Sequence, residues 1–149
     1  MPPITIDAED LIMALEYHGH DAKYIFDRET GDVIFIPDED IVSDVMDEEL
    51  LAAIEEGWGT RYIAIEPVSS SEGWEVMQGF IETIRDERIA ERLHRAIEGT
   101  SPFRRFKDEL LNSPELREAW FRFHDEAFIE LAKGWLAENK IEATLKVRG

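Results

Sequence analysis

The sequence predicts an α+β fold, with a small three-stranded antiparallel sheet and two N-terminal helices followed by a helical C-terminal half. Two observations carry this prediction. In the first 68 residues, short runs rich in β-branched and aromatic side chains alternate with runs of helical period. Over residues 72–140 the apolar residues recur every three or four positions. With 149 residues, we expect a single domain, 1–149, made of a mixed half (1–68) and a helical half (72–140).

The first predicted helix follows Thr5 or Asp7, either of which can act as its N-cap. Its predicted inward residues are Leu11, Ile12 and Leu15. The helix is expected to end near His18-Gly19. Residues 22–28 and 33–36 then read as two strands, because aromatic and β-branched side chains dominate both runs. They flank the turn residues 29–32, Glu-Thr-Gly-Asp, so we expect a β-hairpin.

A second helix is expected to begin at Ser43 or Asp44 and to end at Gly57. Its inward positions are Leu50, Leu51 and Ile54. The run RYIAI at 61–65, closed by Pro67, supplies a third strand. The three strands are expected to form one antiparallel sheet.

The second half of the chain carries four helix signals after the stretch Ser69–Ser71. The first two helices are predicted from Trp74, Met77, Ile81 and Ile84, and from an Asp86 cap followed by Ile89, Leu93, Ile97 and the stop Gly99. The next two begin at Ser101-Pro102 and Ser113-Pro114, where each serine can cap and each proline fits the first helical position. Residues 141–147 could add a strand or fray.

Helical spacing predicts which side chains of the last two helices face inward. In the first of them, Phe103, Phe106 and Leu110 share one face. In the second, the predicted inward stripe is Leu116, Trp120, Phe123, Ala127, Leu131 and Trp135. Most of these aromatic side chains are therefore interpreted as core.

The net charge is −18, and it is unevenly distributed. Acidic residues outnumber basic ones by 15 to 2 in residues 1–50, by 10 to 5 in 51–100, and equal them at 9 to 9 in 101–149. Such a field disfavours nucleic acid and anionic membranes and favours a basic partner, although salt screens it beyond about 10 Å. An ordinary role in solubility is the alternative.

Composition limits the remaining function classes. The chain has no cysteine, which excludes disulfides, thiol catalysis and cysteine-based zinc sites. It has no stretch of about 18 apolar residues and no signal-peptide pattern at its start, so we expect a cytoplasmic protein outside the membrane.

Part of the chain resembles a known family. The strings FRRFKDEL at 103–110 and PELREAWFRFHDEAFIELAKGWLAENKIE at 114–142 are similar to the signature of a bacterial family, uncharacterised protein family number 0158. The resemblance continues upstream through DRETGDVIFIPDED at 27–40, RYIAIEP at 61–67 and MQGFIETIRDERIAERLHRAIEG at 77–99. It thus covers most of the chain and implies a shared domain.

Two positions depart from the pattern of that family. Ser101-Pro102 stands where Gly-Ala or a similar pair is usual before FRRF, and His124 stands where arginine is frequent. Neither departure changes the fold that the resemblance implies. Because the family has no established activity, the resemblance implies nothing about a substrate.

Two candidate metal sites have simpler interpretations. His18 and His20, with Asp21 adjacent, could supply imidazoles, but no further ligands follow at a diagnostic spacing. The acidic run 38–40 lacks the ligand alternation and the glycine of a calcium-binding loop, so a solvated acidic turn fits it better. We therefore expect no metal and no cofactor.

His124, Asp125 and Glu126 suggest acid–base chemistry, since histidine titrates near neutrality. Consecutive helical residues lie about 100° apart, so the three cannot converge on one point, and a partner for His124 is expected from elsewhere in the fold. Motifs for a serine nucleophile, a phosphate loop or a zinc protease are absent.

The cations of the same segment form the better candidate surface. They are Arg104, Arg105, Lys107, Arg117 and Arg122. Guanidinium groups suit carboxylate or phosphate in a partner. The alternative is that these helices dock against the acidic N-terminal half. Some of the charge is also expected to be satisfied by the pairs Arg104–Asp108 and Arg105–Glu109, each four residues apart.

Two functional hypotheses remain. The first is a non-catalytic, acidic protein-interaction or regulatory module that binds another protein. The second is a small-molecule or nucleic-acid-processing enzyme with a site near Arg104, Arg105, His124 and Asp125. Direct nucleic-acid binding is the weaker variant, because the predicted strands lack the paired aromatics of an RNA-binding sheet. Four tryptophans and the apolar helix faces also allow a homodimer.

Overall fold

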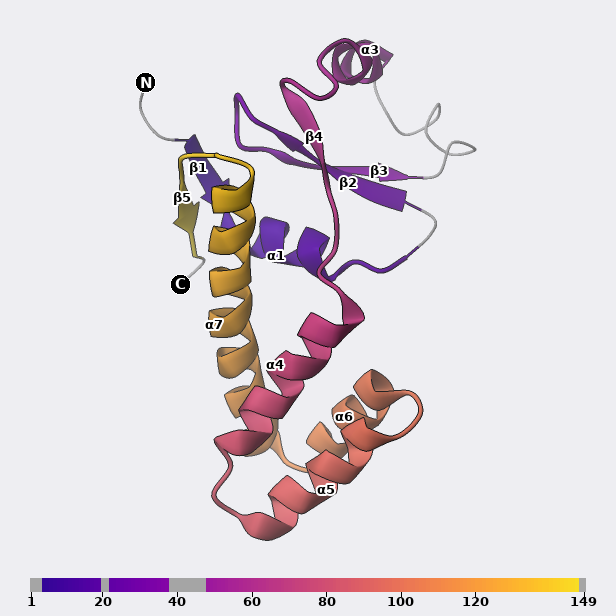
Figure 1. The fold of residues 1–149 in the computed structure, drawn as a ribbon, viewed down its shortest axis with the longest axis vertical. Helices are drawn as coiled ribbons and strands as arrows, with labels where there is room; N and C mark the ends of the chain where they lie inside the picture. Colours follow the sequence, from indigo (N-terminus) through magenta and orange to yellow (C-terminus); the bar gives the residue numbers. More distant parts are fainter. Residues whose placement is uncertain (1–3, 20–21, 38–47, 148–149) are drawn as a thin grey trace. The chain divides into compact units, whose positions relative to one another are not determined.

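The computed structural model describes residues 4–19, 22–37 and 48–147, and the fold is α+β as predicted. Figure 1 shows its elements, which in chain order are β1 (Ile4–Asp7), α1 (Ala8–Glu16), β2 (Ala22–Asp27), β3 (Val33–Pro37), α3 (Glu48–Glu56), β4 (Tyr62–Ile65), α4 (Ser70–Glu82), α5 (Glu87–Glu98), α6 (Pro102–Leu110), α7 (Pro114–Glu138) and β5 (Ala143–Lys146). The predictions that concern His20, Asp21, the run 38–40, Ser43 and Asp44 lie outside the described residues.

The chain divides into two compact units. Unit 1 comprises Met1–Pro67 and Leu131–Gly149, and unit 2 comprises Val68–Glu130. Helix α7 begins in unit 2 and ends in unit 1. The first boundary falls beside the Ser69–Ser71 stretch, where the sequence pattern changes from mixed to helical.

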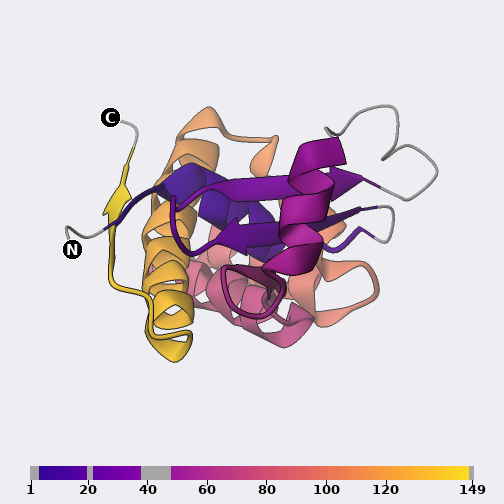
Figure 2. The same ribbon diagram turned by 90° about the horizontal axis from the view of Figure 1, so that it is seen from above.

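The central sheet of unit 1 has the strand order β3-β2-β4, and both pairings are antiparallel. This confirms the predicted hairpin and the predicted third strand. On one face, Ile25 and Ile36 of the sheet pack with Tyr62 and with Ile54 of α3. In Figure 2, α3 crosses this sheet. The predicted inward residue Ile54 is therefore confirmed as core.

The opposite face of strand β2 is also covered. Side chains alternate along a strand, so Tyr24 and Phe26 lie opposite Ile25. The rings of Tyr24 and Tyr17 lie 5.4 Å apart, and those of Phe26 and Trp135 also lie 5.4 Å apart. The middle of β2 is thus covered on both sides, which explains its apolar run Tyr24-Ile25-Phe26.

Helix α1 begins at the predicted cap. The Asp7 side chain accepts a hydrogen bond from the Asp10 backbone N–H at 3.1 Å, while Thr5 lies within β1. Leu11, Ile12 and Leu15 are buried as predicted. The helix ends at Glu16, earlier than predicted, because Tyr17 adopts an extended backbone.

Strands β1 and β5 form a parallel pair that joins the two ends of the chain. The segment 141–147, left open between strand and frayed end, thus contains a strand. In the register Ile4 lies opposite Ala143 and Asp7 opposite Lys146. The hairpin turn approaches β1 closely: a Cβ built on Gly31, whose φ is +84°, would lie 2.9 Å from the Thr5 carbonyl oxygen. This close approach and the positive φ both require glycine.

Unit 2 is built on an aromatic core. Phe80, Phe106 and Trp120 meet edge to face, with ring centroids 4.8–6.2 Å apart. Met77, Ile81, Leu93 and Ile97 are buried with them, as predicted. The predicted cap Asp86 is confirmed, because its side chain accepts backbone N–H bonds in the first turn of α5. Ser69, which was not predicted as a cap, does the same for α4. Local signals therefore define these two helices.

Two predictions about α6 are wrong. Ser101 makes no side-chain cap, because its backbone is left-handed (φ 50°, ψ 52°) rather than extended, as side-chain capping requires. Phe106 and Leu110 are buried, but Phe103 is 40% exposed and lies at the edge of the core. A Cβ built on Gly73 of α4 would lie 3.2 Å from the Phe103 ring, so that small residue accommodates it.

The inward stripe of α7 differs from the predicted one. The buried residues are Trp120, Phe128, Ala132 and Leu136. They are spaced by multiples of four, whereas the prediction took one step of three, from Trp120 to Phe123. Phe123 and the residues that follow it in the predicted stripe are half-buried on one flank.

Candidate functional site

The chain turns sharply on either side of α6, and these turns position the cations predicted as a site. Left-handed Ser101 places Pro102 at the first helical position of α6. After Leu110 the turn closes through bonds from the Asn112 and Ser113 backbone N–H groups to the carbonyls of Glu109 and Leu110. Pro114 then starts α7, and the Ser113 hydroxyl accepts from the Leu116 N–H at 3.3 Å, which confirms the second cap.

One side of α6 is exposed and carries both charge and apolar area. Phe103, Arg104, Lys107 and Leu111 share it by helical spacing, and we call it the α6 outer face. Phe103 is 40% exposed and Leu111 is 68% exposed. Arg104 and Lys107 are exposed between them. The face thus combines two cations with two large apolar side chains.

Arg105 lies apart from this face. A Cβ built on Gly99 would lie 2.5 Å from an Arg105 guanidinium nitrogen, so that side chain reaches back toward the end of α5. The predicted pairs Arg104–Asp108 and Arg105–Glu109 are wrong, because neither forms within 4 Å among the described side chains. Exposed pairs of this kind gain little energy, so their absence costs α6 little stability.

The two arginines of α7 point to different sides of that helix. The Arg117 guanidinium lies 5.5 Å from the centroid of the Phe121 ring, which is 49% exposed. Arg122 points about 140° away from Arg117 around the helix axis. It is exposed, with Glu118 one turn before it and Glu126 one turn after it. In the described part of the chain, no ion pair within 4 Å involves any of the five cations.

His124 belongs to the packed side of α7. Its ring stacks on Phe128 at 4.6 Å and lies 5.4 Å from Trp120, and its side chain is 19% exposed. Its Nδ1 lies 3.2 Å from an Asp125 carboxylate oxygen. The expectation that the neighbouring carboxylates could offer no partner is therefore wrong for Asp125. Arg104 and Arg105 belong to α6, whereas His124 and Asp125 belong to α7.

A pocket of about 220 Å³ lies within unit 2, between α5 and the α6–α7 turn. Its lining residues are Ile89, Arg92, Leu93, Glu109, Asn112, Ser113 and Leu116. Sequence reasoning missed it, because Arg92 and Glu109 come from different helices and neither stands in a recognisable motif. The only available signal was the polar turn Asn112-Ser113 after an apolar helix face.

Unit 1 contains a buried carboxylate that the sequence analysis also missed. Asp27 is 3% exposed and accepts hydrogen bonds from the Glu29 N–H at 2.9 Å and from Arg61 Nε at 3.1 Å. Arg61 also contacts Glu29 at 3.3 Å. Burial acts to raise the pKa of Asp27, but the hydrogen bonds from Arg61, Glu29 and Thr30 outweigh it and hold the pKa below its ordinary value. This cluster ties β4 to the hairpin turn.

The described residues offer no metal cluster: no three histidine, aspartate or glutamate side chains among them gather closely enough to hold an ion. His18 is exposed, two residues after the end of α1. No described helix has the length and apolar character needed to cross a membrane.

The fold and these surfaces define an α+β protein with an acidic unit and a helical unit that carries exposed cations. The model of the uncharacterised protein family UPF0158 matches residues 1–147. The chain is also 32% identical over 142 residues to UPF0158 protein PA5073 of Pseudomonas aeruginosa, which covers 95% of this chain and 88% of that protein. The chain therefore belongs to the UPF0158 family. No solved structure matches it significantly.

Proposed function

We propose that this protein is a non-catalytic interaction or regulatory module that binds an acidic segment of another protein through the α6 outer face. The observation that carries the proposal is that Arg104 and Lys107 are exposed cations without an acidic partner among the described residues. Both are exposed, and neither forms an ion pair with a described residue, although the chain has 34 acidic residues.

The apolar neighbours of these cations support the same function. Phe103 and Leu111 are among the most exposed large apolar side chains in unit 2. Aromatic side chains and arginine are the residue types enriched in the energetic centres of protein interfaces. A partner segment that carries carboxylates beside apolar side chains would satisfy both features of the face.

The alternative of an enzyme near Arg104, Arg105, His124 and Asp125 receives less support. His124 is packed between two aromatic rings, while Arg104 and Arg105 project from different sides of α6. A general base must come within about 3 Å of the atom that carries the proton it removes, and the packed His124 ring leaves little room for a substrate.

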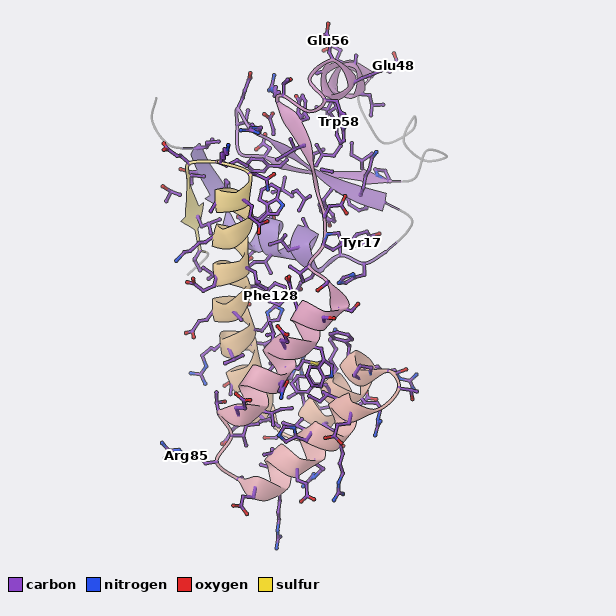
Figure 3. All side chains as sticks on the ribbon, in the orientation of Figure 1. Tyr17, Glu48, Glu56, Trp58, Arg85 and Phe128 are labelled. Carbon is purple, nitrogen blue, oxygen red and sulfur yellow. The ribbon has the colours of Figure 1, made fainter. Side chains whose placement is uncertain are left out.

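The experiment is affinity capture from native lysate at low salt, with nuclease present, followed by mass spectrometry. We expect the wild-type chain to retain a stoichiometric protein that the double variant Arg104→Glu with Lys107→Glu loses. The control is Arg85→Glu with Arg88→Glu, which makes the same charge change elsewhere on unit 2. Figure 3 shows Arg85 extending away from the helices. Equal retention by both variants would refute the α6 outer face as the site.

Three further expectations belong to this proposal. The module is expected to act in the cytoplasm, to bind no nucleic acid, and to be able to form a homodimer. Cell fractionation, retention with and without nuclease, and light scattering of the purified chain test them in turn. A partner lost on nuclease treatment would contradict the second.

A further inference from the structure

We propose that the pocket between α5 and the α6–α7 turn binds a small zwitterion, a free α-amino acid with an apolar side chain. This inference goes beyond the proposed partner binding and uses a different surface, because Arg104 and Lys107 do not line the pocket.

The pocket holds one group of each charge. Arg92 of α5 and Glu109 of α6 both line it, and they form no ion pair with each other or with another described residue. Because Arg92 and Glu109 line one small pocket without forming an ion pair, each remains able to pair with a charged group of a ligand. Its carboxylate would pair with Arg92, and its ammonium group would pair with Glu109.

The helix termini around the pocket reinforce this polarity. Glu109 lies in the last turn of α6, where the helix dipole is negative, and Ser113 caps α7, where the dipole is positive. Both residues line the same pocket. The end of α6 therefore favours an ammonium group and the start of α7 a carboxylate.

The floor and the volume of the pocket limit the ligand. Ile89, Leu93 and Leu116 supply its apolar lining. Cavities that hold drug-sized ligands have volumes of about 300–1,000 Å³, so a pocket of about 220 Å³ takes a smaller molecule. The Asn112 amide nitrogen, which also belongs to a lining residue, lies 3.5 Å from a Glu109 carboxylate oxygen.

The test is a titration of the full-length chain, followed by amide NMR shifts at Leu93, Asn112 and Leu116. The probes are L-leucine, 4-methylpentanoate, 3-methylbutylamine and glycine. Each of the two analogues keeps one charge of L-leucine, and glycine keeps both charges without the side chain. We expect L-leucine to bind about tenfold more tightly than either one-charge analogue, and more tightly than glycine.

Variants assign the two charges. Arg92→Met and Glu109→Gln should each weaken L-leucine binding about tenfold, and Arg88→Met, one helical turn earlier on α5, should leave it unchanged. All three positions are at least partly exposed, so the fold should survive, and circular dichroism checks this. The proposal is overturned if L-leucine gives no saturable shift, if one analogue binds as tightly as L-leucine, or if Arg88→Met has the effect of Arg92→Met.

Discussion

The two units are stabilised by different interactions. Unit 1 joins segments that are far apart in the sequence, through the β1–β5 pair and the Asp27–Arg61 contact. Unit 2 is a continuous run of helices around Phe80, Phe106 and Trp120, and the described part of it contains no buried charged side chain. Unit 1 has 20 acidic against 7 basic residues, whereas unit 2 has 14 against 9.

The charged side chains of the two units therefore have different roles. In unit 1 the best-defined charge contacts are used internally, to hold the hairpin turn to β4. In unit 2 apolar contacts build the core, which leaves its arginines at the surface. The surface of unit 2 is therefore the better place to look for a partner.

Removing the C-terminal return of unit 1 should have the largest effect. A fragment of residues 1–67 lacks β5 and Trp135, so β1 loses its partner strand and Phe26 loses its ring contact. We expect this fragment to be unfolded by circular dichroism, while the full chain unfolds in one transition, as proposed for a single domain. A cooperative melt of the fragment would contradict this account.

Phe106→Ala should cost about 3–5 kcal/mol of unfolding free energy, because it removes a ring that is 1% exposed from the centre of the aromatic core. Urea unfolding followed by tryptophan fluorescence measures it. Leu111→Ala, at the residue next to Leu110 and 68% exposed, is the control and should change stability by less than about 0.5 kcal/mol. Equal costs would mean that α6 is not anchored by Phe106.

Asp27→Asn should cost about 2–3 kcal/mol at neutral pH, since it weakens several charge-assisted hydrogen bonds of a buried carboxylate. Glu29→Gln, which removes only the exposed contact to Arg61, should cost less than about 1 kcal/mol. Urea unfolding of both variants beside the wild type makes the comparison.

The Asp27 effect also has a defined pH dependence. Because the folded pKa of Asp27 lies below its unfolded value of about 3.9, its stabilisation is complete above that value and is lost as the pH falls through the lower folded value. The difference between wild type and Asp27→Asn should therefore shrink below about pH 4. A difference that stays constant into strong acid would contradict the assigned hydrogen bonds.

Gly31→Ala should cost more than Gly59→Ala, by about 1–3 kcal/mol. Both glycines have a φ near +85°, so both substitutions strain the backbone equally. Only at Gly31 would the new methyl group meet other atoms, those of β1, whereas nothing lies within 4 Å at Gly59. Thermal unfolding of the two variants isolates the contact between the hairpin turn and β1, and equal costs would remove that contact from the account.

The sequence predicted features that depend on neighbouring residues better than features that join distant segments. Caps such as Asp7, Ser69, Asp86 and Ser113 act within one turn, so a local pattern reveals the helices that they start. Ser101 failed as a cap because the surrounding turn, not the residue type, sets its left-handed backbone.

Features that join distant segments escaped the sequence analysis. The β1–β5 pair brings together residues 4–7 and 143–146, and no local signal specifies such a pairing. For the candidate site, the sequence identifies the five cations only as a candidate surface. The stacking of His124 and the pocket at Arg92 and Glu109 depend on packing between helices.

On this proposal, Arg104 and Lys107 of the α6 outer face bind a partner and do not stabilise the fold. The most direct measurement is the thermal midpoint of the full chain with Arg104→Glu and Lys107→Glu, compared with Arg85→Glu and Arg88→Glu at the same net charge. We predict midpoints within about 2 °C of each other. A midpoint lower by about 4 °C or more for the α6 variant, a loss of about 1 kcal/mol or more, would show that these cations stabilise the chain itself and would contradict the claim.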